Sequence, residues 1–184
     1  MKKSILKVFV LTLSVILFTQ CGGKTEPNAT TSNKVFATAD EMVADAKTRV
    51  QEISSEELKN VLEGDEPYIL LDVRTAKEHN KGYIPGSILM PRGVLEFRIA
   101  SEKVWDNEGM YVPEKGELIL IYCKKGSRGS LSADALQRLG YTNVKNLFGG
   151  FLEWKKVNPE MIEVNEEAVG VGAAAAEEED AGGC

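Results

Sequence analysis

The chain has 184 residues, of which 43% are hydrophobic, and this length suits one globular domain with further segments at its ends. Its formal net charge is −6, and residues 157–184 contain eight acidic residues and no Lys or Arg, whereas the body is nearly neutral. Without a basic face, nucleic-acid binding is disfavoured. Three Cys and one His are too few for a Cys/His zinc cluster, so we expect neither a metal nor a cofactor.

Residues 1–20 have the pattern of an export signal. Three Lys accompany an apolar run from Val8 to Phe18, which is too short to cross a bilayer. Cys21, which follows this run, resembles the lipidated Cys of bacterial lipoproteins, although Gln20 and Phe18 replace the small residues expected before it. We therefore expect export to the bacterial periplasm or cell envelope with a lipid anchor at Cys21. A soluble exported protein and a retained N-terminal anchor helix are the alternatives.

Composition divides the rest of the chain into four parts. A small, polar tether at 21–33 precedes an N-terminal helix within 34–50, and the main domain follows at 51–157. Residues 158–184 form a Gly-, Ala- and acid-rich segment that we expect to be flexible, and it ends in Cys184.

Within the body, the elements alternate between helix and strand. Ser/Thr-x-x-Glu patterns predict capped helix starts at Thr38, Ser54 and Thr75, and the first of these helices places Met42, Val43, Ala46 and Val50 on one side. Continuous apolar runs at 68–73 and 118–122 predict strands buried on both faces. Segment 94–100 is compatible with a helix, 105–116 with a loop, 131–139 with a helix that Gly140 ends, 141–147 with a strand, and 150–154 with a helix. This alternation predicts an α/β fold with a mostly parallel central sheet and helices on both faces.

Cys123 directly follows the second buried run and precedes a predicted helix. Ligands of open parallel sheets bind at this position, where strands end. The glycines at 126 and 129 permit a tight loop, which would turn backbone N–H groups and the positive end of the helix toward an anion.

The charges of this loop favour an ionised Cys123. Lys124, Lys125 and Arg128 would stabilise the thiolate, which is the nucleophilic form of Cys. His79 lies 44 residues earlier and no pattern places it nearby, so a Cys–His base is not expected. The alternative is an inert buried thiol.

Residues 123–128, C-K-K-G-S-R, match the C-x-x-G-x-R active loop of rhodanese sulfurtransferases. A second block of that family is present as L-D-V-R at 71–74, Glu78 and G-Y-I-P-G-S at 82–87, and a third runs from Leu136 through L-F-G-G-F at 147–151 to Trp154. The blocks occur in the family's order and cover about 51–157, so this region resembles a single-domain rhodanese.

The resemblance implies a thiosulfate sulfurtransferase that uses Cys123. The thiolate attacks the outer sulfur of thiosulfate, sulfite leaves, and the persulfide on Cys123 passes its sulfur to a thiol or to cyanide. By the same resemblance, residues 124–128 bind substrate: their backbone N–H groups hold the persulfide, Lys125 and Arg128 balance the anion, and Lys124 is a solvated neighbour. The expected partners are therefore a small anionic sulfur donor, a small-molecule or protein thiol, and the membrane through the lipid anchor.

Gly126 and Ser127 complete the implied substrate loop, and three further residues are implied to support it. Asp72, Arg74 and Glu78 brace the site and its loops by resemblance, with a purely structural ion pair as the alternative reading.

The spacing from Cys to Arg argues against a phosphatase. The loop is C-x4-R, whereas the phosphatases that share the rhodanese fold use C-x5-R. Three positions depart from the usual rhodanese pattern, since Tyr83, Ser87 and Gly129 stand where His, Ala and Ser are common. The hydroxyl missing at 129 removes a helix cap that Ser130 or Ser132 would replace.

Cys184 is a candidate sulfur acceptor at the end of the acidic segment. The Gly-Gly-Cys ending resembles the arm of the carrier subunit of periplasmic thiosulfate-oxidising systems. Two alternatives to the enzyme stay open: a persulfide- or anion-binding module without turnover, and a thiol redox protein that uses Cys123 and Cys184.

Overall fold

A computed structural model of the chain describes residues 34–166 and 168. Contacts divide the chain after Val35, and the compact unit that starts at Phe36 contains every element below. The helices are α1 (Ala39–Lys47), α2 (Ser55–Leu62), α3 (Ala76–Asn80), α4 (Leu95–Arg98), α5 (Glu102–Asn107), α6 (Ser127–Arg138) and α7 (Gly150–Val157), with a 3₁₀ turn, η1 (Arg92–Val94), before α4. The strands are β1 (Gln51–Ile53), β2 (Ile69–Asp72), β3 (Ile88–Leu89), β4 (Ile119–Tyr122) and β5 (Val144–Leu147).

The strands form one parallel sheet in the order β1-β5-β4-β2-β3. The predicted strands at 68–73 and 118–122 are β2 and β4, and all their residues are buried, as expected for strands covered on both faces. Asp72 of β2 is level with Tyr122 of β4, so these two strands end at the same edge.

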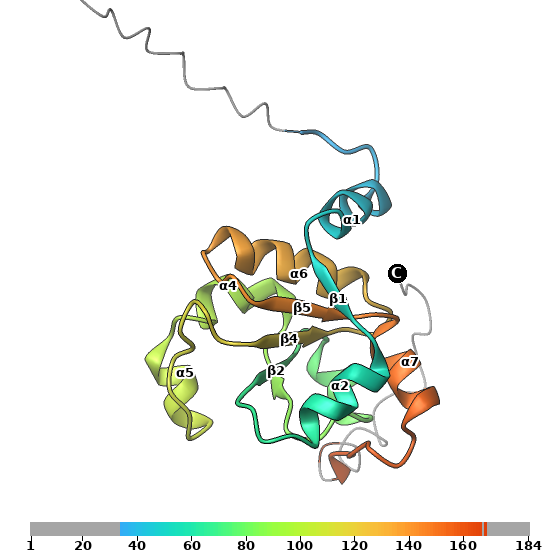
Figure 1. Cartoon of the computed structure of the whole chain (residues 1–184), viewed down its shortest axis with the longest axis vertical. Coiled ribbons are helices and arrows are strands. Elements are labelled where there is room, and N and C mark those ends of the chain that lie inside the picture. The colour runs from blue at the N-terminus through green and yellow to red at the C-terminus, as the bar shows by residue number, and fades with distance from the viewer. Residues whose placement is uncertain (1–33, 167, 169–184) are drawn as a thin grey trace, which may run out of the picture. The chain divides into compact units, whose positions relative to one another are not determined.

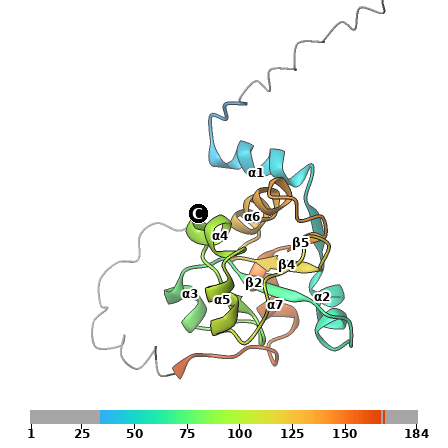
Figure 2. The ribbon, with the colours of Figure 1, turned by 90° about the vertical axis from the view of Figure 1, so that its left-hand side faces the viewer.

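Helices cover both faces of the sheet (Figure 1). On one face, side chains of α4, α5 and α6 pack with the sheet, including Leu95, Trp105 and Leu136. On the other face, Leu58 of α2 and Trp154 of α7 are fully buried. Figure 2 shows this layered arrangement from the side, with α6 and α7 on opposite faces of the strands. The predicted α/β class is confirmed.

Local signals placed the helix starts well. Ser54 and Thr75 each form a complete capping box with Glu57 and Glu78. At α1, Thr38 accepts a hydrogen bond from the Glu41 backbone, but the Glu41 carboxylate bonds to the N–H of Ala37 and not to that of Thr38.

Four elements, α5, β1, β3 and α1, differ from the sequence prediction. Residues 105–107 belong to α5 and not to a loop, because the fully buried Trp105 anchors a helix too short to show apolar periodicity, with its indole N–H donating to Ile99 O. The edge strands β1 and β3 were not predicted, since three and two residues carry little pattern. The first helix ends at Lys47, so Val50 is buried beyond it, while Met42 is exposed.

The segment after α7 continues along the body. Glu163 forms an antiparallel bridge with Tyr83, and the Asn165 N–H donates to Asn80 O at the end of α3. The Trp154 indole N–H donates to Met161 O. The described part of 158–184 is thus hydrogen-bonded to the α3 region up to Asn165.

Candidate active site

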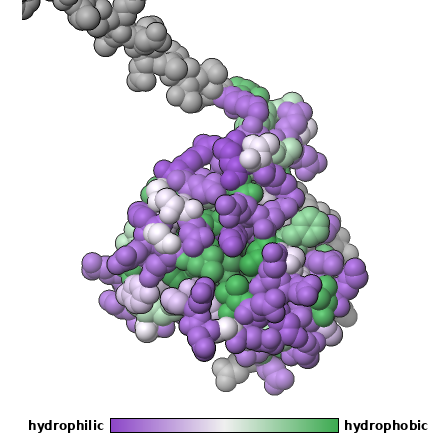
Figure 3. Space-filling view, in the orientation of Figure 1, coloured by the Kyte–Doolittle hydropathy of each residue, from purple (hydrophilic) through white to green (hydrophobic). Residues whose placement is uncertain are grey.

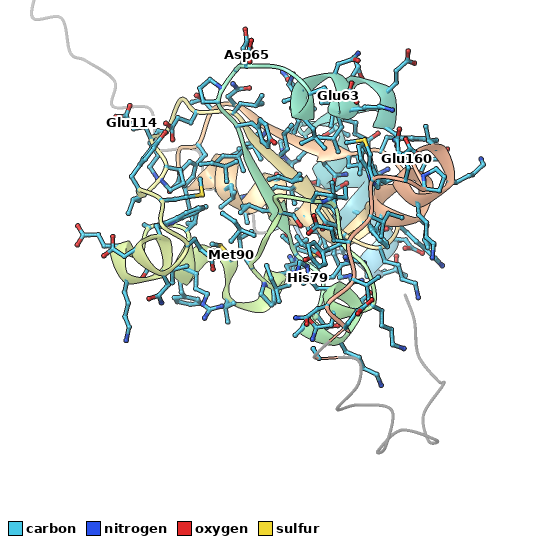
Figure 4. The ribbon with its side chains drawn as sticks, turned by 90° about the horizontal axis from the view of Figure 1, so that it is seen from below. Glu63, Asp65, His79, Met90, Glu114 and Glu160 are labelled. Atoms are coloured by element: carbon cyan, nitrogen blue, oxygen red, sulfur yellow. The ribbon has the colours of Figure 1, made fainter. Side chains whose placement is uncertain are left out.

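Cys123 is the first residue after the central strand β4 and lies at the carboxyl edge of the sheet. The side chain is buried, with 1% of the residue exposed. Val73, which directly follows β2, donates its N–H to Tyr122 O, so the chain after β2 runs beside Cys123. In Figure 4, His79 and Met90 lie at the same edge of the sheet, whereas Asp65 and Glu114 lie at the opposite one. Cys123 therefore occupies the position where open parallel sheets bind ligands.

The sulfur of Cys123 accepts a hydrogen bond from a backbone N–H at the start of α6. The Gly126 N–H donates to Cys123 Sγ over 3.1 Å. Gly126 is the N-cap of α6 in the left-handed conformation, with φ of 98°, and no side chain caps this helix. The predicted caps are therefore wrong: Ser130 Oγ donates to Gly126 O, and Ser132 Oγ has no partner among the described residues. A helix start without a side-chain cap leaves its partial positive charge directed toward the sulfur.

The first turn of α7 holds the other side of the loop. The Phe151 N–H donates to Cys123 O over 2.7 Å, and the Leu152 N–H donates to Lys124 O over 3.1 Å. A Cβ on Gly150 would lie 2.4 Å from Cys123 O and 2.8 Å from Gly126 N. The loop thus rests on the backbone of α7, at a distance that only glycine permits.

Asn146 of β5 supports the loop from inside the protein and was not singled out in the sequence. Its buried Nδ2 donates to Gly126 O and to Ser130 Oγ. A Cβ at Gly129 would lie 2.0 Å from Asn146 Oδ1, so the absence of a side chain at 129 makes room for this amide. The signal that would have found Asn146 is a polar residue in the middle of a buried strand.

The three cations of the loop have different environments. Lys124 and Lys125 are exposed. Arg128 donates from both terminal nitrogens to the two carboxylate oxygens of Glu78, over 2.8 and 2.6 Å. This hydrogen bonding lowers the pKa of Glu78 to about 2 and raises the pKa of Arg128. The charge of Arg128 is therefore already balanced by α3.

Asp72 and Arg74 form a buried ion pair, with 2.6 Å between Asp72 Oδ2 and Arg74 Nη2. Arg74 also donates to Gly82 O and lies 4.1 Å from the centre of the Phe151 ring. Burial acts to raise the pKa of Asp72, but the hydrogen bonds from His79 and Arg74 outweigh it, so the pKa lies below its usual value. The pair thus connects the α3 region to α7 beneath the loop.

His79 and two of the departures from the family pattern lie around this pair. His79 Nδ1 lies 2.8 Å from Asp72 Oδ2, and its ring stacks on Tyr83 with 4.3 Å between centroids. Ser87 Oγ lies 2.8 Å from the hydroxyl of Tyr122, whose pKa is raised by burial. Tyr83 and Ser87 are therefore accommodated by contacts in the layer behind the loop.

Other predicted positions lie outside the described residues, namely the signal at 1–20, Cys21 and Cys184. Within the described part, no helix is long and apolar enough to span a membrane. A cleft of about 630 Å³ opens at the amino ends of β2 and β4, lined by Tyr68, Met110, Tyr111 and neighbouring residues, at the sheet edge opposite Cys123. Figure 3 shows that, in the view of Figure 1, apolar surface gathers near the middle of the face among polar side chains.

Comparison with known proteins matches this architecture to one family. The rhodanese-like domain family matches residues 54–157. A sulfurtransferase from Allochromatium vinosum is 31% identical over 107 residues, which cover 58% of this chain and 90% of that protein. The human thiosulfate:glutathione sulfurtransferase is 33% identical over 89 residues, 46% of this chain and 76% of that protein. A putative mitochondrial thiosulfate sulfurtransferase from Schizosaccharomyces pombe is 33% identical over 93 residues. These residues cover 50% of this chain and 66% of that protein's length.

Solved structures agree with the sequence comparison. The human single-domain sulfurtransferase TSTD1 superposes with a TM-score of 0.54 at 27% identity, covering 58% of this chain and 96% of that structure. With its parallel sheet, its Cys loop and the match over 54–157, the chain belongs to the rhodanese-like domain family.

Proposed function

We propose that this protein is a sulfurtransferase that carries sulfane sulfur on Cys123 as a persulfide. Membership of the rhodanese-like family and its sulfurtransferase relatives support a sulfur-transfer role in general. The observation that carries the specific proposal is the hydrogen bond from the Gly126 N–H to Cys123 Sγ at the uncapped start of α6. Such donors favour the thiolate and stabilise the negative charge of a terminal persulfide sulfur.

The proposed reaction has two displacement steps. The Cys123 thiolate attacks the outer sulfur of thiosulfate, the S–S bond of thiosulfate breaks, and sulfite leaves with the bonding electron pair. An acceptor thiolate or cyanide then attacks the outer sulfur of the persulfide, and Cys123 leaves as a thiolate. No net oxidation of the protein occurs, and the enzyme returns to its starting state.

Donor and acceptor are proposed by analogy with the relatives. The human relative is named for thiosulfate and glutathione, and we propose the same classes here: a small anionic donor and a thiol acceptor. Exposed Lys124 and Lys125 beside the loop are suited to attract an anionic donor. Asp72, Arg74 and Glu78 are assigned a supporting role, because their described contacts hold the segments around the loop.

Intact-mass measurement after incubation with thiosulfate tests the proposal. The protein is expected to gain the mass of one sulfur atom, to lose it on adding cyanide, and to complete many cycles. Cys123→Ser abolishes the gain because the nucleophile is removed, whereas Cys184→Ser keeps it. A gain that persists in Cys123→Ser contradicts the assignment, and loading without repeated turnover supports a sulfur-binding module instead.

We also propose that Cys184 accepts the sulfur of Cys123 and that Cys21 carries a lipid anchor in the cell envelope. The acidic residues at 177–180 precede Cys184 and complement Lys124 and Lys125 in charge. The same mass measurement on protein from a bacterial envelope reports lipid on Cys21. Unchanged transfer to external thiols in Cys184→Ser, without sulfur on Cys184 in the parent, contradicts the acceptor role.

A further inference from the structure

Arg92 is a cation at the same edge of the sheet as Cys123, and no sequence pattern singled it out. Its backbone N–H donates to Val73 O, and the Val73 N–H donates to Tyr122 O, the residue directly before Cys123. The chain after β3 therefore lies beside the chain after β2, which lies beside Cys123.

The side chain of Arg92 starts on the face of the sheet that holds Cys123. Ile88 and Met90 belong to the same buried cluster as Cys123, and side chains of an extended chain alternate between faces. Pro91 stays extended, with φ of −52° and ψ of 136°, so Arg92 follows Met90 on this face. The turn η1, which Arg92 begins, and the following α4 both pack against α6, whose first turn holds the Cys123 loop (Figure 2).

Arg92 has a buried donor without a partner. Its Nε is inaccessible to solvent and makes no hydrogen bond with any described residue. Leaving a buried charged donor unsatisfied is costly, so the half-buried guanidinium of Arg92 is a candidate for binding an anion. The two other arginines described at this edge are different, since Arg74 pairs with Asp72 and Arg128 with Glu78.

We propose that Arg92 binds the anionic oxygens of the sulfur donor while the donor's outer sulfur faces Cys123. This inference rests on the proposed sulfurtransferase function and names the donor class as a small oxyanion such as thiosulfate. The planar guanidinium presents a fork of N–H donors that matches an oxyanion. Arg128, which the sequence motif predicted for this task, has its charge balanced by Glu78, so Arg92 supplies the cation that the donor needs.

The first test measures how fast thiosulfate loads sulfur onto Cys123, by intact mass in the absence of an acceptor. In Arg92→Met the second-order rate falls roughly tenfold to a hundredfold, because a charged hydrogen bond to the donor is lost. The matched control is Arg98→Met, which removes an exposed arginine from neighbouring α4 and leaves the rate unchanged.

The second test needs no sulfur chemistry. Anionic iodoacetate and neutral iodoacetamide alkylate Cys123, and the ratio of the two rates at that residue is measured by peptide mass. Arg92→Met lowers the ratio several-fold, since the cation that attracts the carboxylate is absent, whereas Arg98→Met does not. If the parent protein never takes up sulfur, the proposed function is refuted. The ratio of alkylation rates still shows whether Arg92 attracts anions to Cys123.

A change of fold is controlled by circular dichroism and a second variant. If Arg92→Met does not fold, Arg92→Lys decides, because it keeps the charge and loses the planar fork. For Arg92→Lys, slower loading of sulfur from thiosulfate together with an alkylation ratio equal to that of the parent supports the proposal. Loading equal to that of the parent in a folded Arg92→Met or Arg92→Lys overturns it.

Discussion

Gly150 shows how closely the Cys123 loop is built onto its neighbours. Its φ is 61°, and the backbone atoms of the loop lie where a side chain would start. Gly86 has a similar φ of 74°, but a Cβ added there would have no neighbouring atom within 4 Å. Substituting Gly86 therefore measures only the cost of a side chain at positive φ, whereas substituting Gly150 adds the cost of a clash with the loop backbone.

Gly150→Ala is expected to lower stability by about 1–3 kcal/mol more than Gly86→Ala, because overpacking against backbone adds to the cost of a positive φ. Urea unfolding of both variants measures this difference, and sulfur loading of Cys123 reports whether the loop has moved. Equal losses of stability in the two variants would contradict this expectation, because they would show that the loop moves away from the added methyl group at no free-energy cost.

Residues of the site were predicted unequally well. Cys123 and the glycines of its loop follow from a short local pattern that ends a buried strand. Asn146 and Arg92, the residue proposed to bind the donor, were not singled out, because each lies in another strand or turn and is brought to this region only by the sheet. The ion pair of Arg128 was not predicted for the same reason, since its partner Glu78 lies 50 residues away in the chain.

The ion pair between Glu78 and Arg128 joins two elements, α3 and α6. Glu78 also completes the capping box of α3, so one carboxylate both caps that helix and binds Arg128 of the Cys123 loop. Its pKa in the folded protein is about 2, below its ordinary value of 4.5. Because the folded pKa is the lower one, the stabilisation is complete above pH 4.5 and is lost as pH falls toward 2.

Glu78→Gln is therefore expected to be destabilised relative to the parent at pH 7, and by less at pH 3. The free energy of unfolding in urea at the two pH values measures this convergence. Glu63→Gln serves as the control, because that exposed carboxylate lies 3.9 Å from Lys59 and should show a much smaller change. A difference between parent and Glu78→Gln that is the same at both pH values would contradict the assignment.

Element lengths explain which parts of the fold were predictable. Buried four-residue strands and capped helices carry their own patterns, and these were located correctly. The strands β1 and β3 and the helix α5 are held by neighbours and by single buried residues such as Trp105. Short elements of this kind depend on tertiary contacts more than on their own sequence.

At the scale of the molecule, the segment after α7 packs along the chain between β2 and β3 through backbone hydrogen bonds. Tyr83 and Glu163 exchange two backbone hydrogen bonds, and Asn165 bonds to Asn80 next to the α3 residues that hold the site. This segment lies beyond the region that matches the family, 54–157. It thus adds support that the family pattern does not include.

A chain that ends at Asn158 is expected to be less stable than a reference chain that ends at Glu166, by about 2–4 kcal/mol, because several backbone hydrogen bonds and the indole partner Met161 are lost. Both chains lack Cys184, so thermal melting compares only the segment 159–166. Equal melting temperatures would show that this segment contributes nothing to the fold.

The sequence alone determined the α/β class and the buried strands and singled out Cys123 as the proposed nucleophile, because each follows from residues close together in the chain. Tertiary structure decided how the charges around Cys123 are distributed. Arg128 is neutralised by Glu78 and Arg92 retains an unpartnered donor among the described residues, and both facts depend on contacts between distant segments. Hydrophobic pattern and helix caps act locally, whereas the balance of charge at a site is set by whichever elements the fold brings together.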